Sequence, residues 1–279
     1  MPLMLLVVAL FTITSLNDKY AVSKCHMNGS ELTFLMAAGT SVFLTFLLPF
    51  MDTKITLCPQ TFLCIGLIAL CKYLEFAMSA KILIDMSAFE LKAWLGVVII
   101  LSYFTDVIMG SELKLLKLLM IAVTAAGLVF IALSGRSSVN YKKILIPLIL
   151  YLASSFGYGF VMKAAEPYIS STMTIYFALI ILALVLIPSA KPTKIISNCA
   201  EGRKGVGFVV LAKLPNAFGL LGYNAVAAQS LTNYSFISPM VLIVLFIIGL
   251  VRRDGEKPDK LNLTGSLLCI AGIVGFQFV

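Results

Sequence analysis

The sequence predicts an all-α integral membrane protein with ten transmembrane helices, arranged as two inverted five-helix repeats. The chain of 279 residues is 60% hydrophobic and only 12% charged, whereas an ordinary soluble domain carries roughly a quarter charged residues. Its apolar residues fall into ten runs. The length of each run is close to the roughly 20 residues that a helix needs to cross a bilayer. Short stretches of the first half recur in the second. Because ten spans leave only short connections, a soluble catalytic domain and a nucleic-acid-binding tail are excluded.

Clusters of charge, proline or glycine separate the apolar runs and set the ends of each element. The ten predicted spans cover residues 2–20, 31–50, 57–79, 82–108, 113–133, 142–162, 168–188, 205–230, 232–250 and 261–279. The first span ends in the charged group Asn17-Asp18-Lys19. The eighth contains Pro215, which has no backbone N–H to donate, so we expect that helix to be interrupted.

Internal repetition divides the chain into a first half, residues 1–135, and a second half, residues 136–279, with five spans each. Three pairs of short stretches match in order: 80–87 with 228–235, 110–112 with 255–256, and 126–129 (Ala-Gly-Leu-Val) with 271–274 (Ala-Gly-Ile-Val). An odd number of spans per repeat places the two halves in opposite membrane orientations. The sequence therefore predicts an inverted repeat, an arrangement common among secondary transporters.

The formal net charge of +8 resides mainly in the connections between spans. Of the 21 Lys and Arg residues, 14 follow odd-numbered spans, 4 follow even-numbered spans and 3 lie inside spans. The positive-inside rule explains this distribution better than nucleic-acid binding does, and no nucleic-acid partner is expected. It places the richer side in the cytoplasm and both termini outside. We expect a plasma membrane of the bacterial type.

Motifs for catalysis or cofactor binding are absent from the sequence. It has no GxxxxGK[ST] phosphate loop, no HExxH and no GxSxG, so neither ATP-driven pumping nor enzymatic activity is expected. His26 is the only histidine, which excludes a histidine metal cluster. The six cysteines are scattered without a CxxC pair, and we expect free thiols. No cofactor or metal is expected.

Several short elements accompany the five-plus-five repeat along essentially the whole chain. They are Asn17 with Lys24 after the first span, glycine with glutamate at 110–112 and 255–256, and Ala-Gly at 126–127 and 271–272. In these features the chain resembles the drug/metabolite transporter superfamily, in particular its ten-helix EamA-like branch. The resemblance implies alternating-access carriage of small polar metabolites, commonly amino acids, sugars, nucleotide sugars, nucleobases or amines.

Two departures from the family pattern stand out. Members often have a proline early in the fourth helix of each half; the second half has Pro239, whereas Leu91 is its counterpart in the first half. Related transporters also usually have both termini in the cytoplasm, opposite to the orientation that the charge count predicts here. We keep the orientation from the charge count as the expectation.

Ionisable side chains inside the spans are the first candidates for a binding site, because each costs up to about 2.5–3.5 kcal/mol within a membrane helix. Lys72 and Glu75, three residues apart, share one face of the third span. Glu90 lies early in the fourth span at a similar depth. We expect a half-buried cluster that holds a zwitterion, with Glu75 and Glu90 as candidates for proton coupling. A structural ion pair is the alternative. Asp106 is expected at the membrane interface.

Two polar stripes complete the candidate site. Lys213, Asn216 and Tyr223 lie on one face of the eighth span, beside its expected interruption. A polar face next to a broken helix is typical of a binding site near the membrane midplane. In the sixth span, Tyr158 belongs to a milder stripe of hydroxyl and aromatic side chains that suits a small polar ligand or an amine. Ordinary helix packing is the alternative explanation for both stripes.

We therefore expect a secondary transporter that moves a small polar metabolite by alternating access, through a cavity lined by spans 1, 3, 4, 6, 8 and 9. An amino acid or similar zwitterion is favoured, because lysine and glutamate occur together in the cluster. A sugar, a nucleotide sugar or an organic amine is the alternative cargo. An intramembrane enzyme acting on lipids and a non-transporting membrane scaffold are more remote alternatives.

The expected partners are the metabolite and the lipid bilayer. Small residues also form faces on the fifth and tenth spans, at Ala122 and Ala126 and at Ala271 and Gly275. Such faces let helices approach closely. They could pack the two halves together or form a homodimer.

Overall fold

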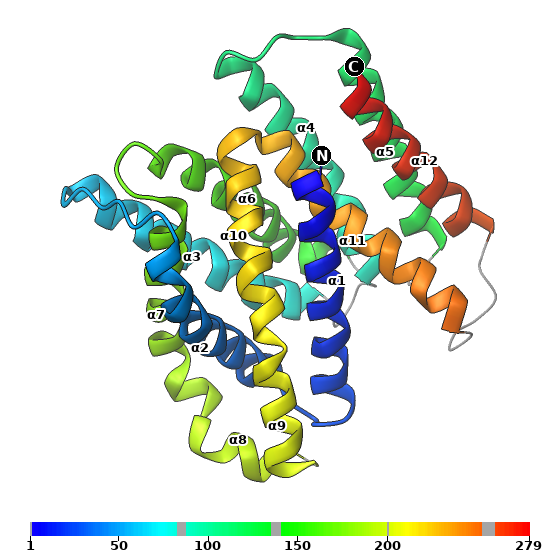
Figure 1. The fold of residues 1–279 in the computed structure, drawn as a ribbon. Helices are drawn as coiled ribbons and strands as arrows, with labels where there is room; N and C mark the ends of the chain where they lie inside the picture. Colours follow the sequence, from blue (N-terminus) through cyan, green and yellow to red (C-terminus); the bar gives the residue numbers. More distant parts are fainter. Residues whose placement is uncertain (1, 83–87, 135–140, 200, 253–259) are drawn as a thin grey trace.

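The fold was obtained as a computed structural model, which describes residues 2–82, 88–134, 141–199, 201–252 and 260–279 (Figure 1). These residues form helices and no strand; the one β-type contact is an isolated bridge between Ile55 and Ile169. The helices are α1 (Pro2–Ser23), α2 (Gly29–Leu47), the short 3₁₀ helix η1 (Leu48–Phe50), α3 (Pro59–Ile82), α4 (Ala88–Ile108), α5 (Leu115–Ser134), α6 (Tyr141–Ala165), α7 (Ser171–Ala190), α8 (Pro192–Asn198), α9 (Gly202–Leu211), α10 (Lys213–Gln229), α11 (Leu231–Arg252) and α12 (Lys260–Phe278).

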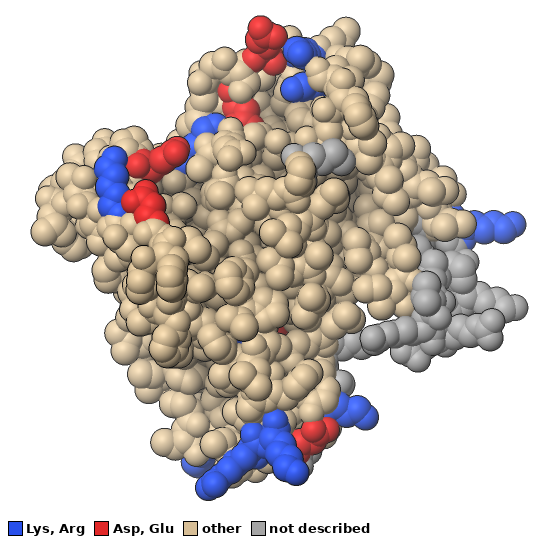
Figure 2. Space-filling model, viewed as in Figure 1, with Lys and Arg blue, Asp and Glu red and all other residues tan. Residues whose placement is uncertain are grey.

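The predicted all-helical class is confirmed for the described residues, and several of the helices have the length and composition of membrane spans. Five stretches of the described chain are long and apolar enough to cross a bilayer: Gly29–Phe50, Pro59–Ser79, Lys142–Ala165, Ser171–Ala190 and Gly202–Gln229. Shorter apolar helices occupy the other predicted spans. In Figure 2 the charged side chains gather near the edges of the visible face, and its middle is almost entirely tan.

The predicted interruption of the eighth span is present. Helix α9 ends at Leu211 and α10 begins at Lys213, with Ala212 between them. Pro215 lies in the first turn of α10, where its missing N–H removes the bond that would reach back to the carbonyl of Leu211. The proline therefore permits a bend at the level where Lys213 enters the protein interior. A further short helix, α8, precedes α9 and was not predicted.

Five of the most extensive helix contacts join opposite halves of the chain, and α4 also packs on α5 within the first half. Helix α1 contacts α10, α3 contacts α6, α2 contacts α7, α4 contacts α11 and α5 contacts α12. The largest apolar core extends through the molecule and takes buried residues from α1 to α7 and from α10 to α12. In Figure 1, α1 and α10 lie side by side in the middle of the molecule, and α5 and α12 form a pair at its right-hand side.

The contact between α5 and α12 is made backbone to backbone. A Cβ atom added to Gly127 would lie 2.6 Å from the carbonyl oxygen of Gly265, and the reverse distance is also 2.6 Å. The fifth and tenth helices thus pack against each other, which is one of the two alternatives given for their small-residue faces. Of the residues named for these faces, Gly275 lies in the contact, where a Cβ would collide with Met120 Sδ. Ala122, Ala126 and Ala271 are exposed, because these positions lie on the outer face of the pair.

Candidate functional site

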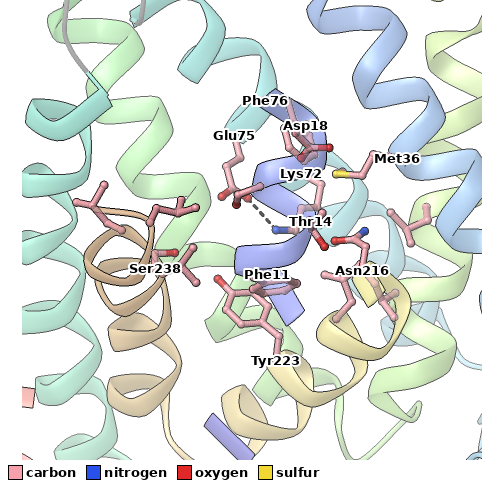
Figure 3. Close-up of a pocket in the computed structure, with 17 residues that line it drawn as sticks. Phe11, Thr14, Asp18, Met36, Lys72, Glu75, Phe76, Asn216, Tyr223 and Ser238 are labelled. Atoms are coloured by element: carbon pink, nitrogen blue, oxygen red, sulfur yellow. Dashed lines mark hydrogen bonds and ion pairs between the residues drawn. The ribbon is translucent and has the colours of Figure 1, made fainter. Parts of the chain in front are cut away.

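A cavity of about 260 Å³ lies between the two halves of the chain; we call it the central cavity (Figure 3). Helices α1, α2, α3, α7, α10 and α11 supply its described lining. Its polar and aromatic lining residues are Phe11, Thr14, Ser15, Asp18, Lys72, Glu75, Phe76, Asn216, Tyr223 and Ser238. The remaining lining is apolar: Met36, Ile175, Leu179, Leu220, Val241, Leu242 and Leu245.

Lys72 and Glu75 form an ion pair on α3, with 2.9 Å between Nζ and Oε2. Their spacing of three residues places both on one helix face, as the sequence predicts. The Lys72 ammonium also lies over the ring of Tyr158, 4.0 Å from its centroid, and 5.8 Å from the centroid of Tyr223. A desolvated cation over an aromatic face gains about 2 kcal/mol. The lysine is thereby held by a carboxylate and an aromatic wall.

Three tyrosines from α6, α10 and α11 form that wall; we call them the tyrosine cluster. The ring centroids of Tyr223 and Tyr234 are 4.4 Å apart, and Tyr158 stacks 6.0 Å from each of them. Two hydroxyls are satisfied within the protein: Tyr158 donates to Asn224 Oδ1 at 2.5 Å, and Tyr234 donates to the carbonyl oxygen of Ser155 at 3.2 Å. Of the three tyrosines, Tyr223 lines the central cavity.

A second ion pair connects α1 with α10. The Lys213 ammonium lies 2.6 Å from Asp18 Oδ1, and its side chain packs on Gly39 of α2, where a Cβ would come within 3.2 Å of Lys213 Cγ. One turn along α10, Asn216 donates from Nδ2 to Thr40 Oγ1 at 2.8 Å. These contacts tie α1, α2 and α10 together below the cavity wall.

The structure brings most of the predicted site residues together. Lys72, Glu75, Asn216 and Tyr223 line the central cavity. Tyr158 lies directly behind Lys72, and Lys213 lies behind Asp18.

Two predictions concern the fourth and sixth spans, and the one about Glu90 stays a prediction. Glu90 belongs to α4, but its side chain lies outside the described part of the chain. The cavity was expected to be lined by spans 4 and 6; its described lining comes from α2 and α7 instead. The reason is that α6 packs tightly on α3, so its tyrosine supports the lysine from behind.

Helix α1 lines the cavity, as expected for the first span, but Phe11, Thr14 and Asp18 were not among the predicted site residues. Phe11, Thr14 and Asp18 face the cavity, spaced as one helix face. The sequence carries this signal, since a threonine and an aspartate recur at that spacing in an apolar run. Asp18 belongs to the charged group at the end of the first span, so it was assigned to the helix end and not to a cavity-facing stripe. Ser238 of α11, close to Pro239, was also missed, because a lone serine in an apolar helix gives no pattern.

Asp106 lies near the end of α4, and its side chain is buried in the protein. Its side chain accepts hydrogen bonds from the Ser230 hydroxyl at 2.9 Å and from the backbone N–H groups of Leu231 at 3.1 Å and Thr232 at 2.9 Å. Lys163 of α6 lies 2.9 Å from the same carboxylate. Asp106 therefore caps the start of α11 and joins it to α4 and α6.

A second cavity of about 350 Å³ adjoins Asp106. Its lining comprises Tyr103, Asp106, Ser111, Glu112, Lys114, Lys117, Ser230, Thr232, Asn233 and Phe276. Across it, Gln277 donates to Asn233 Oδ1 at 2.6 Å. The two cavities are lined by different residues, and the tyrosine cluster lies in the core near the central one.

Among the residues that the structure describes, no group of three or more histidine, cysteine or acidic side chains could hold a metal ion. The chain matches no model of a known protein family. A search of curated proteins likewise finds no match.

Proposed function

We propose that this chain is a secondary transporter of a small polar metabolite, with the fold of the EamA-like branch of the drug/metabolite transporters. The observation that carries the proposal is the Lys72–Glu75 ion pair at the wall of an apolar cavity between the two halves. Charged groups deep in a membrane protein are expensive and mark the pathway of a substrate or ion. A structural pair alone would not need a cavity beside it.

The packing of the helices supports the predicted inverted repeat. A two-fold relation between the halves would exchange the first span with the sixth and the third with the eighth. It would therefore turn the contact between α1 and α10 into the contact between α6 and α3, and both contacts exist. It would also pair α2 with α7, α4 with α11 and α5 with α12, as observed. Ten spans in two inverted halves account for this set of contacts.

Alternating access requires a cavity that opens to one side at a time. Asp18 and Glu75 lie toward the C-terminal ends of α1 and α3, which face the cytoplasm in the orientation that the charge count predicts. On the other side, the tyrosine cluster and the Asp106 network join α4, α6 and α11. We assign this arrangement to the state that faces the cytoplasm, with both termini outside.

The size and lining of the cavity favour a small cargo. About 260 Å³ is slightly less than the roughly 300–1,000 Å³ of pockets for drug-sized ligands. An amino acid or similar zwitterion matches this space and the two charge signs, whereas a nucleotide sugar exceeds it. A sugar or an organic amine remains the alternative cargo. The lipid-acting enzyme is disfavoured, because Glu75 and Asp106 belong to separate cavities.

Transport by purified protein in proteoliposomes tests the proposal. We expect uptake of at least one amino acid or amine above that of empty vesicles, and a change in rate when a proton gradient is imposed. Glu75→Gln and Glu90→Gln, measured separately, test the predicted coupling, and at least one should lose the pH dependence. Absence of both transport and binding across a broad metabolite panel, with folded protein, would refute the transporter assignment.

A further inference from the structure

Both ion pairs of the central cavity have the same asymmetry. In the α3 pair, the Lys72 side chain is 10% exposed and that of Glu75 is 23% exposed. In the pair between α1 and α10, the Lys213 side chain is 0% exposed and that of Asp18 is 31% exposed. Asp18 lines the cavity, whereas its lysine partner does not. The carboxylates are thus the more accessible members of both pairs.

Both lysines already have partners within the protein. The Lys72 ammonium already donates to Glu75 and lies on the Tyr158 ring, and Lys213 is enclosed behind Asp18. Each ionised carboxylate, in contrast, has two acceptor oxygens and about four acceptor positions, of which its lysine uses one. A ligand in the cavity therefore meets two carboxylates with free acceptor positions, beside the Lys72 ammonium and the hydroxyl groups of Thr14, Ser15 and Ser238.

Aromatic and apolar side chains surround these acceptors. Figure 3 shows Glu75, Asp18 and Phe76 around one end of the central cavity, with Phe11 and Tyr223 at the other. Aromatic faces attract cations and also accept apolar groups. Between them the walls are formed by aliphatic side chains such as Leu179, Leu220 and Leu242.

We propose that the central cavity binds ligands composed of an ammonium group and an apolar or aromatic body, with the ammonium held between the carboxylates of Asp18 and Glu75. A carboxylate on the ligand is not required. The assignment rests on the proposed transport function and narrows its cargo to amines and to amino acids recognised through their amino group. An anion without an amine meets two carboxylates of like charge and is rejected.

Three probes that share a phenyl group test the assignment: 2-phenylethylamine, phenylalanine and 3-phenylpropionate. Binding to the purified full-length protein in detergent is measured by thermal shift and calorimetry, since a ligand of the folded state raises its stability. We expect 2-phenylethylamine and phenylalanine to bind. The affinity for 3-phenylpropionate should be at least tenfold lower than that for 2-phenylethylamine. Acid binding as tight as that of the amine, or no binding by any of the three, would overturn the assignment.

Charge-balanced double variants locate the ammonium. Asp18→Asn alone leaves the buried Lys213 without a partner, so it is combined with Lys213→Met; likewise Glu75→Gln is combined with Lys72→Met. We expect each double variant to bind 2-phenylethylamine with an affinity at least tenfold lower than that of the unmodified protein. Glu166→Gln, an exposed acid in the connection between α6 and α7, serves as the matched control and should leave binding unchanged. Unchanged amine affinity in both double variants contradicts the assignment.

Transport of the same three probes separates this assignment from the proposed function. If the amine binds but no probe is moved in proteoliposomes, the ammonium site stands and the transporter proposal fails. If the acid is bound and transported while the amine is neither, the transporter proposal stands and the ammonium site is wrong.

Discussion

Lys213 is wholly enclosed by protein, and its ammonium lies 2.6 Å from Asp18 Oδ1 on another helix. The two residues are separated by nearly the whole first half and part of the second, yet they form one of the two charged contacts of the central cavity. Taking an ammonium out of water is expensive and is compensated only by close, well-directed contacts. This pair therefore bears on both stability and binding.

Removing Asp18 alone should destabilise the protein strongly. Asp18→Asn leaves the Lys213 charge buried without its partner, and breaking a buried pair in this way costs about 3–5 kcal/mol. We expect a clear drop in the midpoint of thermal unfolding in detergent. The double variant with Lys213→Met should recover most of the loss, because no charge is left unpaired. Equal midpoints for the single and double variants would contradict this account.

Tyr158 combines two roles that substitutions can separate. Tyr158→Phe removes the hydroxyl that donates to Asn224 but keeps the ring under Lys72, so we expect a stability loss of about 1 kcal/mol and intact ligand binding. Tyr158→Leu also removes the ring, and the loss of about 2 kcal/mol of cation–π attraction should release Lys72 and weaken binding. Binding affinity measured in both variants checks the distinction. Equal binding losses would show that the ring has no separate role.

Because α5 and α12 approach closely, substitutions at neighbouring positions of α5 should differ sharply in their effect on stability. Gly127→Ala introduces a Cβ 2.6 Å from the Gly265 carbonyl oxygen, a backbone atom that cannot move aside, and should cost about 1–3 kcal/mol. Ala126→Leu, on the exposed side of the same helix, should leave thermal stability unchanged. Size-exclusion chromatography of the second variant also tests the homodimer, since a change in its oligomeric state would place the dimer contact on this face.

Cys58, in the connection before α3, reports the orientation of the chain. The charge count places this connection outside the cell, so a membrane-impermeant maleimide should label Cys58 on intact cells and not label Cys58→Ser. Labelling that appears only after permeabilisation would place both termini in the cytoplasm, as the family resemblance implies. Cys25, in the connection between α1 and α2, is buried and should stay unlabelled on intact cells in either case.

The pH dependence of this labelling follows from the surroundings of each thiol. A hydrogen bond with the Thr61 hydroxyl, followed by backbone N–H groups at the start of α3, lowers the pKa of Cys58 below that of an ordinary thiol. Burial, together with the neighbouring Cys199, raises the pKa of Cys25 to about 12. The thiolate is the reactive form, so the labelling rate of Cys58 should rise with pH and reach half its maximum below the pH typical of free cysteine.

Asp106 should hold the far end of the molecule closed. Asp106→Asn removes the charge that pairs with Lys163 and weakens the cap of α11, so α11 is expected to separate from α4 and α6 more often. Labelling of Asn233→Cys in a Cys58→Ser background should then become severalfold faster. Glu112→Gln, an exposed acid at the same cavity, is the control. A labelling rate unaffected by Asp106→Asn would contradict a gating role.

Local patterns were sufficient for part of the fold and site. Composition and run length predicted the helical membrane class, and Pro215 predicted the interruption between α9 and α10. The pairing of Lys72 with Glu75 also followed from the sequence, because residues three apart share a helix face. Each of these features depends on chain neighbours within a few residues, where the periodicity of a helix fixes the geometry.

Only the tertiary structure decided which faces meet. Asp18 was an unremarked charge at a helix end until α1 and α10 packed together, and Asp106 acquired its role when α11 began at its carboxylate. Tyr158 could be placed on a polar stripe, but not behind Lys72. Helical periodicity predicts which residues of one helix share a face. The helix that packs against this face is set by contacts between segments distant along the chain, and no local sequence pattern encodes these contacts.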